Sequence, residues 1–172
     1  EIYPILTPQA IDAGHPFPTI SNVSLNFLIE LRSNTDGSTR YARLKNPNNM
    51  PRFIFVPRTK QSAYGELGFN STADDIILLE DLIREHLGKL FPGNTVVKTV
   101  LFRITRNTDI EIEEDEADDL LEAVKDFVEQ RRFGDVVRLE IAHGTAKELS
   151  AFLTERLGMQ PFQIYRVKGP LA

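Results

Sequence analysis

The second half of the chain alternates strand-like and helix-like stretches, and this alternation restricts the fold more than any other feature. Three stretches have strand character: 96–106, 136–142 and 162–167. Apolar residues at helical spacing separate them, first over 117–128 and then over 149–157, which ends at Gly158. This β-α-β-α-β order predicts a sheet that is at least partly parallel, with right-handed crossovers. Thr145 and Glu148 have the spacing of a capping box at the second helix.

The first half predicts hairpins instead of crossovers. Its strand-like stretches are 24–32, 39–46, 52–57 and 76–79, and turn residues follow the first of them. A helical pattern over 79–90 stops at Pro92 and Gly93. Four prolines in residues 1–22 predict an irregular lead-in, and polar residues 58–74 predict a surface loop. We therefore expect one α+β domain over residues 1–172, with a mixed β-sheet, N-terminal hairpins and a C-terminal β-α-β-α-β part.

Composition sets limits on the class of protein. A chain of 172 residues with 41% apolar residues suits one globular domain. There is no Cys, so disulfides and thiolate metal sites are excluded, and a net charge of −5 disfavours broad binding to nucleic acid. We expect a cytoplasmic protein, since we find no signal peptide and no apolar run of transmembrane length. The strand-like sequence at the very start predicts a piece of a longer chain.

An acidic run over 109–118 has two interpretations. Glu114, Asp115 and Glu116 precede the apolar stripe of a helix, where acidic groups interact favourably with the positive end of the helix dipole. The alternative is a metal site, but the run lacks the glycine and the ligand spacing of a calcium loop. The pattern favours the helix start.

Arg103 is a candidate for binding an anion, although the sequence alone favours a solvated strand face. Strand alternation places Arg103 and Thr105 on one face, and Asn107 follows if the strand continues. The planar guanidinium fork matches phosphate oxygens well. The competing interpretation is a solvated strand face whose arginine pairs with a neighbouring acid.

The histidines do not predict a catalytic centre. His15, His86 and His143 are far apart in sequence and form no metal-binding pair. No base or orienting partner for a nucleophile is visible, and the chain has no phosphate-binding P-loop.

Several segments resemble polyphosphate kinase of the long-chain, histidine-phosphorylating type. They are LTPQAIDAGHPFPTISNVSLN (6–26), PRFIFVP (51–57), LEDLIREHLGKLFPG (79–93), FRITRNTDIEIEEDEADDLLEAV (102–124), RRFGDVVRLEI (131–141) and YRVKGPL (165–171). The part resembled is the middle, or head, domain of that family. The resemblance places the phosphorylated histidine in C-terminal domains related to phospholipase D, and no residue here matches it; His15 belongs to the head domain's own HPFP segment. Residues 58–74 look longer than the family's loop, and His86 departs from its pattern.

The resemblance also implies an activity. In the full-length enzyme, ATP donates its terminal phosphate to a histidine, which passes it reversibly to polyphosphate; ATP and Mg²⁺ serve that enzyme, and this domain alone binds neither. The head domain is expected to help wall a polyphosphate tunnel and to contact the partner subunit of a homodimer. Four residues match family segments and are candidates for these contacts: Arg52, Arg103, Arg106 and Asn107. We expect no catalytic or metal-binding residue in the chain.

Two alternatives stay open: a stand-alone module that binds anions or assembles without kinase chemistry, and a metal-dependent hydrolase built on the acidic run. Peripheral membrane association of the full-length protein is also left open.

Overall fold

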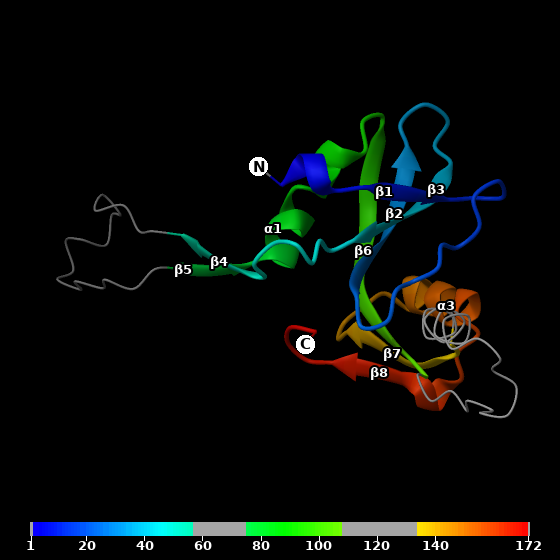
Figure 1. Ribbon diagram of the computed structural model, residues 1–172. Coiled ribbons are helices and arrows are strands. Elements are labelled where there is room, and N and C mark those ends of the chain that lie inside the picture. The colour runs from blue at the N-terminus through cyan, green and yellow to red at the C-terminus, as the bar shows by residue number, and fades with distance from the viewer. Residues whose placement is uncertain (1, 57–74, 108–133, 172) are drawn as a thin grey trace, which may run out of the picture.

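The fold is built on one mixed β-sheet. The computed structural model describes residues 2–56, 75–107 and 134–171. Its six-stranded sheet has the order β1-β3-β2-β6-β7-β8 (Figure 1). The strands are β1 Pro8–Ile11, β2 Leu25–Ser33, β3 Thr39–Lys45, β6 Asn94–Arg106, β7 Val136–Ala142 and β8 Ile164–Val167. Neighbours pair antiparallel except β7 and β8, which are parallel. The predicted α+β class with a mixed sheet is confirmed.

The predicted partly parallel pairing is confirmed in one strand pair, whereas the expectation of an irregular lead-in needs correction. The β6–β7 pair is antiparallel, so only the last β-α-β unit contributes the parallel pairing that the alternation predicted. The proline-rich lead-in is also more regular than expected, since it contains a one-turn 3₁₀ helix, Tyr3–Ile5, and the edge strand β1. Pro8 begins that strand, a position where a missing N–H is tolerated.

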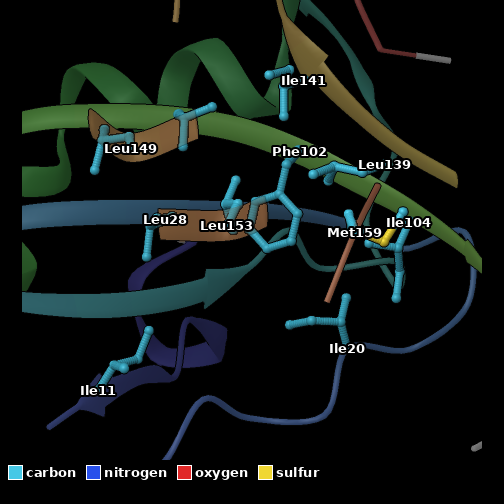
Figure 2. Close-up of a cluster of buried hydrophobic side chains, with 11 residues drawn as sticks. Ile11, Ile20, Leu28, Phe102, Ile104, Leu139, Ile141, Leu149, Leu153 and Met159 are labelled. Atoms are coloured by element: carbon cyan, nitrogen blue, oxygen red, sulfur yellow. The ribbon is translucent and has the colours of Figure 1, made fainter. Parts of the chain in front are cut away.

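The sheet buries apolar side chains on both faces. On one face, α3 (Lys147–Arg156) packs Leu149 and Leu153 onto a cluster that includes Phe102, which lies at the centre of the labelled side chains in Figure 2. On the other face, α1 (Leu79–Glu85) and the 3₁₀ helix η3 (Leu87–Leu90) cover a second cluster. Alternate residues of β2 serve opposite faces, as period-two geometry requires: Phe27 belongs to the second cluster and Leu28 to the first.

The start of α3 differs from the predicted capping box. Its N-cap residue is Ala146, and no side chain caps the helix. Thr145 Oγ1 instead donates to the Ala142 carbonyl at 2.6 Å, and Glu148 pairs with Lys98 at 3.3 Å. The predicted end is confirmed, because Gly158 follows the helix with φ of +64°, a conformation that favours glycine.

A two-stranded ribbon extends from the body of the molecule (Figure 1). It pairs β4 (Phe53–Val56) with β5 (Asp75–Leu78) in antiparallel register. The predicted loop over 58–74 and the acidic run over 109–118 lie outside the described residues, so both interpretations stay predictions. In the described ranges, no helix is long and apolar enough to cross a membrane.

Candidate functional site

A groove lies at the end of the sheet where β2 begins and β3 ends. We call it the Arg52 groove; its volume is about 440 Å³. The lining residues that carry charge or hydrogen-bonding amides are Asn22, Lys45, Asn46, Asn48, Arg52 and Arg103. No Asp or Glu is among the described residues that line it. The composition of this surface suits an anion.

Arg52 is held at the base of the ribbon by two other segments. Its Nε donates to Glu80 Oε1 at 2.8 Å, and its second guanidinium nitrogen donates to the same oxygen and to the Leu171 carbonyl. The Glu80 side chain is 2% exposed and that of Arg52 is 30% exposed. The buried carboxylate therefore fixes the orientation of a guanidinium that still reaches the groove.

Arg103 belongs to a charge cluster that crosses three strands. Arg103 and Arg138 each donate to Glu140 at 2.7 Å, and the Arg138 guanidinium lies 4.0 Å from the centre of the Tyr165 ring. Burial opposes ionisation of Glu140, but the hydrogen bond and charge of Arg103, with the charge of Arg138, outweigh it and lower the pKa of this carboxyl. Two arginines thus share one carboxylate, which leaves an excess of positive charge beside the groove.

Lys45 and Asn46 add polar groups to the groove that have few hydrogen-bond partners among the described residues. Lys45 Nζ is 3.5 Å from Ser21 Oγ and has no carboxylate partner in the described part of the chain. Asn46 is 8% exposed, and its buried Oδ1 accepts no hydrogen bond from described residues. Buried amides are normally satisfied. Because Oδ1 is an acceptor, it would pair with a donor, whereas an ionised phosphate would need the Nδ2 group of Asn46. Neither residue was identified from the sequence. The only sequence feature that could indicate them is a lysine at the end of a predicted strand, shortly before the turn residues PNN.

Arg106 has a supporting position rather than a place in the groove lining. Its Nε donates to the Ile20 carbonyl at 3.0 Å, and its terminal nitrogen donates to the Gly134 carbonyl at 2.6 Å. Its backbone N–H donates to Asn22 Oδ1 at 2.9 Å, and Asn22 lines the groove. Burial lowers the pKa of Arg106, with the charge of Asp135 opposing the shift. The side chain therefore anchors the segment that forms one rim of the groove.

The four predicted site residues consequently divide into two sets. Arg52 and Arg103 meet in one groove although they are far apart in sequence. Arg106 braces that groove, and the backbone N–H of Asn107 donates to the Asp135 carbonyl at 2.8 Å, at the edge of the described segment. The pairing of Arg103 with a neighbouring acid is confirmed by its contact with Glu140, and anion binding by Arg103, which also lines the groove, stays a prediction.

The histidines lie apart from this site. His15 is exposed, and its Nδ1 is 3.0 Å from Asp12 Oδ1. The hydrogen bond from His15, followed by that from the Gly14 backbone, lowers the pKa of Asp12. His86 ends α1. Within the described ranges, no three His, Asp or Glu side chains are grouped closely enough to hold a metal ion.

The fold and the groove define an α+β domain with a cationic surface at one end of a mixed sheet. The chain belongs to the family of the polyphosphate kinase middle domain, whose family model matches residues 1–172. It is 40% identical over 171 residues to polyphosphate kinase of Thermosynechococcus vestitus and 42% identical over 171 residues to polyphosphate kinase 1 of Chlorobaculum tepidum. These alignments cover 99% of this chain but only 22% and 24% of the two relatives.

A solved structure shares the fold. The crystal structure of polyphosphate kinase from Porphyromonas gingivalis superposes with a TM-score of 0.70 at 21% identity. The match covers 99% of this chain and 22% of that one. The described chain therefore spans about a fifth to a quarter of the length of the proteins that it resembles.

Proposed function

We propose that the chain is the middle domain of an enzyme that transfers the terminal phosphate of ATP reversibly to long-chain polyphosphate through a phosphohistidine. Membership of the middle-domain family and the names of the relatives support this. ATP and Mg²⁺ would act in neighbouring domains, which would also supply the histidine. Splitting the transfer at a histidine nucleophile replaces one difficult step with two easier ones.

The contribution of this domain is to guide the polyphosphate chain along the Arg52 groove, as part of a tunnel wall. The observation that carries this proposal is a groove without described acidic lining residues, where Arg52 and Arg103 are both held by buried carboxylates. Guanidinium groups that are already held in place lose less side-chain entropy when they bind phosphate oxygens than free arginines do. Lys45 has no such carboxylate among the described residues and adds a charge that they do not compensate.

A second contribution is contact with the partner subunit of a homodimer through the ribbon. The β4–β5 register places Phe53, Phe55 and Ile76 on one face. Their exposed fractions are 57%, 64% and 57%. Three large apolar side chains side by side on a projecting ribbon favour a protein partner that removes them from water.

Binding of linear polyphosphate to this chain tests the role of the groove. Arg103→Gln should weaken binding about tenfold, because it removes a charged hydrogen-bond donor. Glu140 keeps Arg138 as a partner in that variant. Arg32→Gln removes the same charge from an exposed site near the other end of β2 and is the matched control. Equal affinities of the two variants would contradict the proposal.

Labelling with γ-phosphate-labelled ATP and Mg²⁺ tests the wider assignment. The full-length enzyme should acquire an acid-labile phosphate, and this chain alone should not. Labelling of the chain alone would place a phosphorylated histidine in this domain. Absence of labelling in the full-length protein would favour the alternative, a stand-alone anion-binding or assembly module without kinase chemistry.

A further inference from the structure

Arg43 is a buried cation that has no counter-charge among the described residues. The residue is 7% exposed and lies on β3, between β1 and β2. Its Nε donates to Asn26 Oδ1 at 2.8 Å, and a terminal nitrogen donates to Gln9 Oε1 at 2.6 Å. Both acceptors are neutral amides, and no carboxylate of the described chain forms a salt bridge with this guanidinium. Buried charges in proteins are usually paired, so this arrangement calls for an explanation.

The guanidinium lines a second groove, which we call the Arg43 groove. Its volume is about 360 Å³, and its polar lining residues are Thr7, Gln9, Arg43, Lys45, Asn48 and Asn49. None of the described lining residues is acidic. Burial alone lowers the pKa of Arg43, with no charged neighbour opposing it. A bound anion would supply the charge that the protein does not.

The two grooves adjoin at the segment that follows β3. Lys45, Pro47 and Asn48 line both of them. Each groove has at least one arginine, and Lys45 lies at the junction with no carboxylate partner in the described ranges. The positive groups are therefore spread over two adjoining grooves instead of one pocket, and this spread suits a linear polyanion better than a compact one.

We propose that the Arg43 groove binds phosphate groups and continues the Arg52 groove as one path for a linear polyphosphate chain. This inference rests on the proposed function and extends it to residues outside the Arg52 groove. Arg43 and Lys45 bind the charge of the polymer, and the Asn48 and Asn49 amides donate to its oxygens. The amides of Asn26, which is buried, and of Gln9, which is exposed, fix the fork of Arg43 in place before the polymer arrives.

The lining distinguishes a phosphate chain from a nucleotide. Triphosphate groups are common to polyphosphate and ATP, so both offer the same oxygens to arginine. No aromatic side chain lines the Arg43 groove among the residues described, so a nucleobase finds no stacking partner there. Phosphate oxygens alone therefore account for the recognition, and adenosine adds nothing to the affinity.

Asn49→Asp is the test variant, measured by calorimetry with long-chain linear polyphosphate at fixed ionic strength. Asn49 is exposed and lines only the Arg43 groove, so the new carboxylate repels an anion there and leaves the buried network of Arg43 intact. We expect affinity to fall about tenfold. Thr35→Asp adds the same charge in the exposed β2–β3 turn, at the opposite end of the sheet, and should change affinity less than about twofold. Tripolyphosphate and ATP are titrated into the same proteins as second and third ligands.

Each result decides the proposal. Loss of affinity in Asn49→Asp but not in Thr35→Asp supports it. No loss in Asn49→Asp, with a loss in Arg103→Gln, overturns the second groove and leaves the proposed function standing. Failure of the unmodified chain to bind polyphosphate overturns both. Binding of ATP about tenfold tighter than tripolyphosphate, abolished by Asn49→Asp, would assign the groove to a nucleotide and overturn the polymer path.

Discussion

At the residue scale, Arg106 stabilises the molecule more than its exposure suggests. It donates to the carbonyls of Ile20 and Gly134, which come from segments far apart in sequence. Arg106→Met leaves both carbonyls without this charged donor and should lower the free energy of unfolding by about 2 kcal/mol. Urea unfolding measures the change. Arg32→Met, at an exposed site, should cost less than about 0.5 kcal/mol, and an equal loss in both variants would contradict the bracing role.

Glu140 gives the molecule a defined response to acid. Its lowered pKa means that the folded chain favours the carboxylate more than the unfolded chain does. The contribution to stability is complete above the unfolded pKa of about 4.3 and is lost as the pH falls through the lower folded value.

Glu140→Gln isolates this contribution from those of other carboxylates. The difference in unfolding free energy between the wild type and this variant should therefore shrink between about pH 6 and about pH 3. Urea titrations at the two pH values measure the difference. If the difference in unfolding free energy is the same at both pH values, the contacts of the two arginines with Glu140 do not stabilise the fold through the ionised carboxylate.

Side-chain direction was predictable at this scale, but the partners were not. Alternation along β6 correctly separated Phe102 and Ile104, which are buried in the α3 cluster, from Arg103 on the opposite face. The pairing of Arg103 with Glu140 depends on the β6–β7 register, which sequence periodicity does not fix. Arg43 was missed because a single arginine within a strand carries no signal of its burial between two neighbouring strands.

At the element scale, the β4–β5 ribbon groups several exposed apolar side chains that a partner could cover. Phe55 is 64% exposed and points to the same face as Phe53 and Ile76. If this face forms the proposed contact with a second subunit, Phe55→Ser should raise the dissociation constant of the proposed full-length dimer by at least about tenfold. Sedimentation velocity over a dilution series gives that constant.

Phe162→Ser is the matched control for the ribbon. Phe162 is 78% exposed and lies in the 3₁₀ helix Pro161–Gln163, away from the ribbon. The same substitution there should leave the dissociation constant within about twofold of the wild type. If it weakens the dimer as much as Phe55→Ser does, general exposure of apolar side chains explains the association better than the ribbon does.

Most elements could be placed from sequence, and the misses have physical causes. The strand over 136–142 agrees with β7 at both ends, and the boundaries of β2, β3 and β6 differ by no more than two residues. β1 was not predicted because it is an edge strand of only four residues that begins with proline. The order of strands in the sheet was not predictable either. β6 pairs with β2, which is far from it in sequence, and local sequence patterns do not encode such a contact.

At the scale of the whole molecule, the two apolar clusters make the sheet a rigid support for a charged surface at its end. Both faces are packed, by α3 on one side and by α1 with η3 on the other (Figure 1). The groove residues come from separate segments, β3, the base of the ribbon and β6, and meet only when this sheet is complete. The relatives are four to five times longer than the stretch that they share with this chain, which leaves room outside it for the phosphoryl transfer that the proposed function assigns to other domains.

Lys45 is the position at which that division of labour can be tested in the full-length enzyme. It lines both grooves, so Lys45→Glu puts a negative charge at their junction. In the reverse reaction, from polyphosphate and ADP, the KM for polyphosphate should rise about tenfold while the KM for ADP stays unchanged. A polymer path outside the reacting centre requires this split, because it binds only one of the two substrates. Lys147→Glu, in the exposed first turn of α3, is the control and should change neither constant. A parallel rise in both constants would place Lys45 in contact with the nucleotide site, and no change in either would remove the junction from the path of the polymer.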